Sequence, residues 1–193
     1  MVKNERMSYE KRKEEIKKVA SKVFVEKGFS NTTMEDLVRE TGLSKGGFYY
    51  YYKNTTDIIY DLMVEGINYR NEIIKKSLDI EKEISIEFLA REMTKKVIDD
   101  TTLAGVYVEF LLAKKRNEKL EEIYKTLVRK TIESFKKINI NFDNYNIAVR
   151  KFEILTFFIN SMILSSNILK GRDTLLENRA LLEEMFLLIL KDE

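Results

Sequence analysis

The chain has 193 residues, of which 44% are hydrophobic and 34% charged, and its net charge is +2. This balance fits a folded protein with a well-solvated surface, and the near-neutral charge indicates no particular partner. There is no Pro, Cys or His. Long helices can therefore run unbroken, while disulfides, thiolate catalysis, serine triads and His-based zinc or di-iron chemistry are excluded. We predict no catalytic residue, no metal site and no cofactor, although an enzyme using only carboxylates, Lys or Tyr remains compatible with the composition.

Neither end of the chain predicts a targeting or membrane segment. Residues 1–15 are polar and charged, unlike a signal peptide. The most apolar run, 154–169, is interrupted by polar residues and falls short of the roughly 20 apolar residues of a spanning helix. We expect a cytoplasmic protein without membrane contact, in which this run forms a core or subunit-interface helix. The absence of Cys fits a reducing compartment.

Three helices are expected within residues 1–53. An apolar stripe at helical spacing predicts a first helix that ends at Gly28. Thr33 and Asp36 predict the capped start of a second helix that ends at Gly42, and Ser44 predicts the cap of a third. Two short helices joined by a Gly-containing turn are typical of a helix-turn-helix. The stripe of the first helix consists of Ile16, Val19, Ala20, Val23 and Phe24, and its outer face carries Lys13, Lys17, Lys18 and Lys22. We expect Lys13, Lys17 and Lys18 to form a solvated face, with contacts to phosphates as the alternative.

The rest of the chain also has helical periodicity, so the predicted fold class is all-α. No segment alternates apolar and polar residues as a strand would. A loop is expected at 139–144 and a tight turn at 170–173. The expected helices cover about 58–78, 84–100, 103–116, 117–138, 145–169 and 174–191.

The third predicted helix has an unusual composition. Gly46 and Gly47 each cost a helix about 1 kcal/mol relative to Ala, and close approach to a DNA backbone would explain that cost. Five aromatic residues follow, at 48–52. A helix spreads them about 100° apart, so they cannot all face one core. We assign Phe48 and Tyr52 to the core and expect the three Tyr residues between them on or near the open side. The alternative is that residues 48–52 form a core or subunit-contact cluster.

These features together resemble the TetR family of bacterial regulators over the first third of the chain. The resemblance runs in fixed register from Ile16 to Ile58 and includes Gly28-Phe29, Thr32-Thr33, and Gly42-Leu43-Ser44-Lys45-Gly46. It implies an N-terminal three-helix DNA-binding module in residues 1–53, a C-terminal helical ligand-binding and dimerisation domain in 54–193, and a homodimer on a palindromic operator. The DNA contacts it implies are Thr33, Ser44, Lys45, Gly46, Tyr49, Tyr50, Tyr51, Lys53 and Thr55.

Two positions depart from the family pattern. Family members usually have a phosphate-binding Lys where this chain has Thr55. Thr55 could still cap the next helix and donate its backbone amide, with Lys53 as the nearest cation. Val38 stands where the family prefers Ala, at the crossing of the two helices, which requires slightly wider packing.

Apolar side chains in the C-terminal part are candidates for an effector pocket and a dimer contact, with plain core as the alternative for both. Glu109, in an apolar stretch, could orient a ligand or face solvent. Two interface helices from each subunit would form a four-helix contact. The pocket candidates are Tyr69, Phe88, Met93, Tyr107, Phe110, Tyr124, Phe158 and Met162, and the interface candidates are Phe157, Ser161, Ser165, Ile168, Leu182, Met185, Phe186 and Ile189.

The function predicted from the sequence is that of a TetR-like transcriptional repressor. It would bind double-stranded operator DNA as a homodimer and be released by a small apolar or amphipathic effector. The first alternative is a helical ligand carrier or enzyme without DNA binding. The second is a helical interaction module with a vestigial helix-turn-helix.

Overall fold

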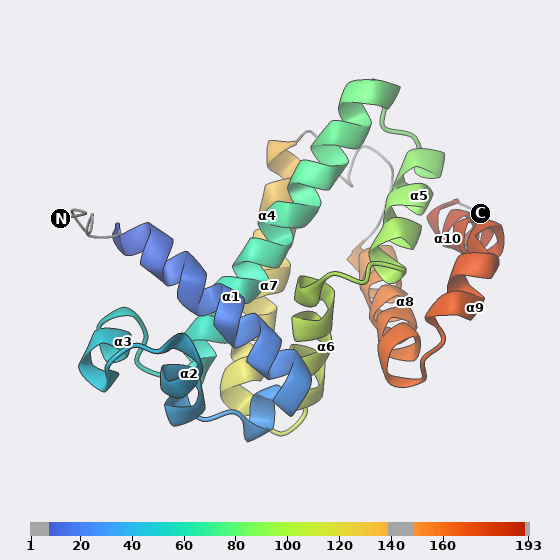
Figure 1. Cartoon of the computed structure of the whole chain (residues 1–193). Coiled ribbons are helices and arrows are strands. Elements are labelled where there is room, and N and C mark those ends of the chain that lie inside the picture. The colour runs from blue at the N-terminus through green and yellow to red at the C-terminus, as the bar shows by residue number, and fades with distance from the viewer. Residues whose placement is uncertain (1–7, 139–148, 192–193) are drawn as a thin grey trace. The chain divides into compact units, whose positions relative to one another are not determined.

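In the computed structural model, which describes residues 8–138 and 149–191, every regular element of the described residues is a helix (Figure 1). The all-α prediction is therefore confirmed. The predicted loop at 139–144 and the predicted helix start at 145 lie outside the described residues. None of the helices described is long and apolar enough to cross a membrane.

The chain divides into two compact units. The first comprises Met1–Gly66 and Thr102–Lys125, and the second comprises Ile67–Thr101 and Thr126–Glu193. The first unit thus extends beyond the predicted module of residues 1–53. It contains α1 (Tyr9–Lys27), a 3₁₀ turn η1 (Phe29–Asn31), α2 (Met34–Thr41), α3 (Lys45–Tyr51), the first part of α4 (Thr55–Glu81), α6 (Thr102–Lys114) and the start of α7 (Glu118–Lys137).

Local capping sets the first three helices where the sequence predicted them. Ser8 caps α1 by accepting from the Lys11 amide, and Gly28, at φ +88°, ends it. Gly42 ends α2 in the left-handed conformation at φ +66°, which a residue without Cβ adopts without strain. Because these signals depend on neighbours in the sequence, they can be read without the tertiary structure.

The core of the first unit joins α1, α2, α3 and α4. The predicted placement of Phe48 and Tyr52 in the core is confirmed, since both are buried. Phe48 anchors α3 itself, and Tyr52 is the residue of extended backbone that directly follows the helix. Other fully buried side chains of this core are Ile16, Ala20, Phe24, Leu37, Ile58 and Ile59.

In the second unit, α5 (Ile86–Val97) packs against α8 (Val149–Ile168) and α10 (Arg179–Leu190), which lie side by side in Figure 1. The prediction of one helix over 174–191 is wrong, because α9 (Arg172–Glu177) and α10 are separate. The break is at Asn178, whose side-chain amide donates to the Thr174 carbonyl at 2.8 Å. Such local side-chain bonds compete with helix continuation.

Candidate DNA-binding surface

Thr33 and Asp36 lock the start of α2 in a reciprocal cap. The Thr33 hydroxyl accepts from the Asp36 amide at 3.1 Å and donates to the Asp36 carboxylate at 2.8 Å. The backbone amide of Thr33 donates to the same carboxylate at 2.9 Å. Both donors of Thr33 are thus occupied, so a phosphate could reach them only by displacing Asp36. The prediction of a Thr33 phosphate contact did not foresee this competition.

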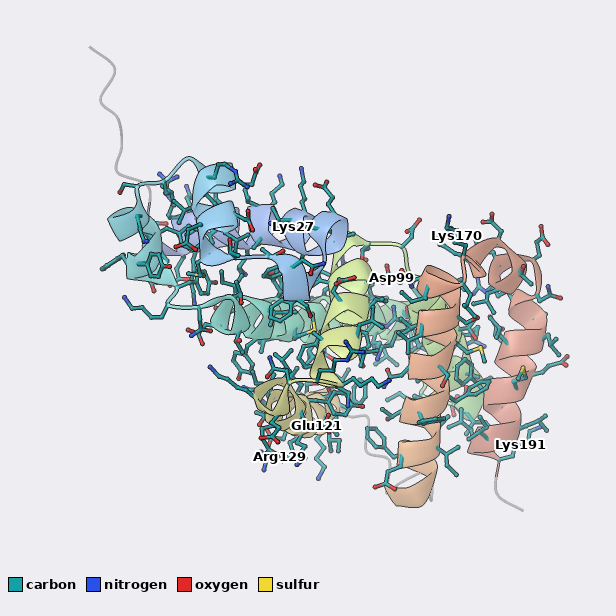
Figure 2. The ribbon with its side chains drawn as sticks, turned by 90° about the horizontal axis from the view of Figure 1, so that it is seen from below. Lys27, Asp99, Glu121, Arg129, Lys170 and Lys191 are labelled. Carbon is teal, nitrogen blue, oxygen red and sulfur yellow. The ribbon has the colours of Figure 1, made fainter. Side chains whose placement is uncertain are left out.

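The Asp36 carboxylate also ties α2 to the end of α1. It pairs with Lys27, the last residue of α1 (labelled in Figure 2), and with Arg39 at 2.8 Å. The ion pair with Lys27, then the bonds from Thr33 and Arg39, hold the pKa of Asp36 well below its usual range. The carboxylate therefore remains charged at any ordinary pH and fixes the direction of α2.

The two glycines of α3 have different local surroundings. Ser44 caps the helix by accepting from the Gly47 amide at 3.2 Å, and a Cβ at Gly47 would lie 3.0 Å from the Ser44 hydroxyl oxygen. A side chain at Gly47 would therefore press on the hydroxyl that caps α3. A Cβ at Gly46 would meet nothing within 4 Å, and Gly46 is exposed. No contact within the described residues therefore requires a glycine at position 46. Because Gly46 has no side chain, the outer side of α3 is flat at this position.

Lys45 and Tyr50 project from the same short helix. The Lys45 ammonium lies 3.3 Å from a Glu35 carboxylate oxygen and 5.8 Å from the centre of the Tyr49 ring. An exposed pair of this kind is worth little, so an incoming phosphate can compete for the Lys45 ammonium. Tyr50 is 68% exposed, whereas Tyr49 is half-buried with its ring edge-on to Phe48 at 6.5 Å. Of the three predicted Tyr contacts, Tyr50 is the most accessible.

The remaining predicted contacts lie at the end of α3 and the start of α4. Tyr51 is half-buried, packed against Tyr50 with ring centres 5.1 Å apart. The exposed Lys53 donates to the Tyr49 carbonyl and so folds back onto the end of α3. Thr55 is the first residue of α4, but the cap expected of it comes from Asn54, whose side-chain oxygen accepts from the Asp57 amide at 2.9 Å.

Sequence reasoning missed the role of the first turns of α1. Lys13 lies 2.7 Å from Asp61 and Lys17 pairs with Glu65, both on α4, so these two lysines are not simply a solvated face as predicted. The hydrogen bond to Asp61 raises the pKa of Lys13 above its ordinary value. Lys13 and Lys17 are four residues apart on α1, and the two carboxylates are four residues apart on α4. This matching spacing is the signal that could have revealed the pairing.

Comparison with known proteins matches the same segment. Residues 16–61 fit the family model of bacterial regulatory proteins, tetR family. Over 131 residues the chain is 32% identical to the uncharacterised HTH-type transcriptional regulator YfiR of Bacillus subtilis. Residues 16–61 therefore carry the sequence pattern of the TetR family, and the chain is similar to this family over that segment. The match with YfiR covers 67% of this chain and 64% of that relative, less than two thirds of its length.

Solved structures extend the similarity of fold to most of the chain. Salmonella enterica GusR superposes with a TM-score of 0.72 at 16% identity, covering 98% of this chain and 100% of that one. FadR from Bacillus subtilis, in complex with stearoyl-CoA, superposes with a TM-score of 0.58 at 16% identity, covering 90% of this chain and 97% of FadR. At these identities the likeness concerns the fold.

The predicted pocket residues are divided between the two units. Tyr107, Phe110 and Tyr124 lie in the first unit as a stack with successive ring centres 6.5 Å apart. Phe110, at the middle of that stack, is fully buried. Glu109 points inward to a structural partner, since it accepts from the Phe29 amide at 2.9 Å. The other pocket candidates lie in the second unit and are Tyr69, Phe88, Met93, Phe158 and Met162.

The predicted interface residues separate into a buried and an exposed group. Leu182 and Phe186 are buried in the core of the second unit, where Phe186 packs edge-on against Phe158 at 5.3 Å, so they do not face a second subunit as predicted. Phe157, in contrast, is 76% exposed, and Ile168 is also exposed. Half-buried positions of the predicted interface are Ser161, Ser165, Met185 and Ile189, and exposed apolar residues that the prediction omitted are Ile154, Leu169, Leu181 and Leu188.

Proposed function

We propose that this chain is a transcriptional repressor that binds a palindromic DNA operator as a homodimer through α3 and is released by a small apolar or amphipathic effector. The observation that carries the proposal is the exposed face of α3, where Lys45, Gly46 and Tyr50 are accessible and a Cβ at Gly46 would meet nothing within 4 Å. Such a regulator acts in the cytoplasm and needs no catalytic residue.

The chemistry of this face suits duplex DNA. The second helix of a helix-turn-helix lies in the major groove, where phosphates fix its position and base edges give specificity. Lys45 supplies a cation for a phosphate, and Tyr50 supplies a phenol and a ring for a sugar or a thymine methyl group. The open backbone at Gly46 allows the closest approach. Each feature has a partner on DNA, and each remains exposed in the described part of the chain.

Exposed apolar side chains in the second unit support a homodimer. On α8 they recur along one face at Ile154, Phe157 and Ile168, and on α10 at Leu181 and Leu188. Apolar stripes of this kind, left in water on two neighbouring helices, are typical of a subunit contact. Two helices from each protomer would then form a four-helix interface that places two copies of α3 on two half-sites.

An apolar or amphipathic effector is supported by the aromatic and Met side chains of the helices after α4. Phe158 and Met162 on α8 are half-buried, and Phe88 on α5 is fully buried. Ligand sites are lined mainly by such residues. The similarly folded FadR binds stearoyl-CoA in its solved structure, which supports an acyl-bearing molecule as the first effector to test.

The test is binding of the purified protein to the DNA upstream of its own gene, measured by fluorescence anisotropy at low salt. We expect specific binding that weakens steeply with salt, because Lys and Arg contacts to phosphates release counterions. Tyr49→Ala should weaken it, and a shuffled duplex of the same length is the control. Equal binding to both duplexes, or no binding, would overturn the proposal, and tight ligand binding without any DNA binding would favour a carrier.

A further inference from the structure

The recognition helix α3 is too short to hold its own exposed side chains in place. It spans seven residues, Lys45–Tyr51, and includes two glycines. Isolated helices of this length are not stable in water, so packing against other elements must define its geometry. Phe48 is the only residue of α3 that is fully buried. The outward side chains of α3 therefore need support from elsewhere.

One face of α1 provides that support. Tyr9, Lys13 and Lys17 recur every four residues and so lie along the same side of the helix. The Lys13 ammonium lies 5.0 Å from the centre of the Tyr52 ring and 2.7 Å from Asp61. Lys17 pairs with a carboxylate further along α4. This face is thus fixed against the end of α3 and the start of α4.

Tyr9 continues this face to the outward side of α3. Its ring centre lies 5.8 Å from that of Tyr50, edge-on at 83°, and 5.0 Å from that of Tyr51. Tyr50 and Tyr51 are themselves perpendicular at 5.1 Å. Offset and edge-on pairs at these distances attract one another beyond simple burial. The Ser8 cap orders the turn of α1 that carries Tyr9.

We propose that Tyr9 is a positioning residue of the DNA-binding surface: its ring holds Tyr50 and Tyr51 in the orientation in which they meet DNA. The inference rests on the proposed function and adds to it a residue outside the helix-turn-helix. Tyr9 is 44% exposed and Tyr50 68% exposed. Without the contact with Tyr9, Tyr50 would keep its ring contact with Tyr51 but would have more rotamer freedom. The loss of that freedom on binding would be an additional cost.

The test is a mutant cycle on affinity for the same upstream duplex. Tyr9→Ala should weaken binding about tenfold, since ordering effects of this size are typical of aromatic pairs. Tyr9→Phe keeps the ring and should stay within about twofold of the wild type. In a Tyr50→Ala/Tyr51→Ala background, at salt low enough to retain measurable binding, Tyr9→Ala should have almost no further effect. An equal loss in both backgrounds, or no loss in the wild-type background, would overturn the inference.

A second measurement is independent of DNA. The ring-proton resonances of Tyr50 and Tyr51 in the free protein should shift when Tyr9 is replaced by Ala, whereas the thermal midpoint should change little because Tyr9 is partly exposed. Unchanged resonances would refute the positioning role even if DNA binding fell. Shifted resonances in a protein whose wild type binds no specific duplex would refute the proposed function and leave Tyr9 as a structural contact only, which also overturns the inference.

Discussion

Replacing Gly46 by Ala is expected to stabilise the protein and yet weaken DNA binding. Gly in a helix costs about 0.5–1 kcal/mol relative to Ala, because more backbone freedom is lost on folding. The backbone of Gly46 lies in α3 without a positive φ, and the added Cβ would meet nothing within 4 Å. No steric clash would therefore offset the gain in stability from the higher helix propensity of Ala. The expected increase of up to about 1 kcal/mol corresponds to about 2–4 °C in Tm for a chain of this size.

The same methyl group would stand on the outer surface of α3. If DNA approaches the backbone at Gly46, the methyl group holds it away and loosens the contacts of Lys45 and Tyr50 on either side. A loss of about 1–3 kcal/mol, or roughly 5- to 160-fold in Kd, is the expected size for one disturbed contact region. Urea and thermal unfolding measure the first effect, and anisotropy with the upstream duplex measures the second.

Gly47→Ala is the matched control in the same helix. Its Cβ would lie 3.0 Å from the Ser44 hydroxyl that caps α3, so the propensity gain is offset by a disturbed cap. Its stability should be unchanged or reduced. A Gly46→Ala protein that binds the duplex as well as the wild type would refute close approach at this position. A Gly46→Ala protein that is less stable than the wild type would refute the propensity argument.

Three further predictions concern stability and assembly. The lowered pKa of Asp36 means that its charged form stabilises the fold above about pH 4 and that this contribution is lost as the pH falls towards the folded-state pKa. The free energy of unfolding of Asp36→Asn, measured in urea, should therefore depend less on pH between about pH 6 and pH 3 than that of the wild type. Parallel curves for the two proteins would contradict the assignment. Phe157→Glu places a charge on the exposed face of α8 and should convert a dimer to a folded monomer in analytical ultracentrifugation; an unchanged dimer would exclude this face. Gly28→Ala should lower the free energy of unfolding by about 1–3 kcal/mol, because φ +88° is strained for any residue with a Cβ, and an unshifted urea midpoint would disprove that strain.

The sequence by itself determined the helix-turn-helix, because its signals are local. The Thr33–Asp36 pair, Gly42 and Ser44 act within one turn of chain, and each is found in the structure in the capping or turning role its spacing predicts. Tyr52 was also placed in the core correctly, although it follows α3 in an extended conformation and not on a helical face shared with Phe48. The same reasoning gave a wrong prediction at Asn178, because the apolar residues keep their helical spacing on both sides of it and predict a single helix. In the structure, the side chain of Asn178 bonds to the Thr174 carbonyl at the end of α9.

The tertiary structure alone decided which partners these local elements meet. In the sequence, Tyr9 is one residue of a polar N-terminal segment, and only the fold places its ring against that of Tyr50. The two residues are 41 positions apart, so their contact produces no periodic pattern in the sequence. Likewise, Phe186 and Phe157 have the same chemistry, but packing buries the first against Phe158 and leaves the second in water. Periodicity shows that a helix has an apolar face, whereas only the packing of other helices decides which face is covered.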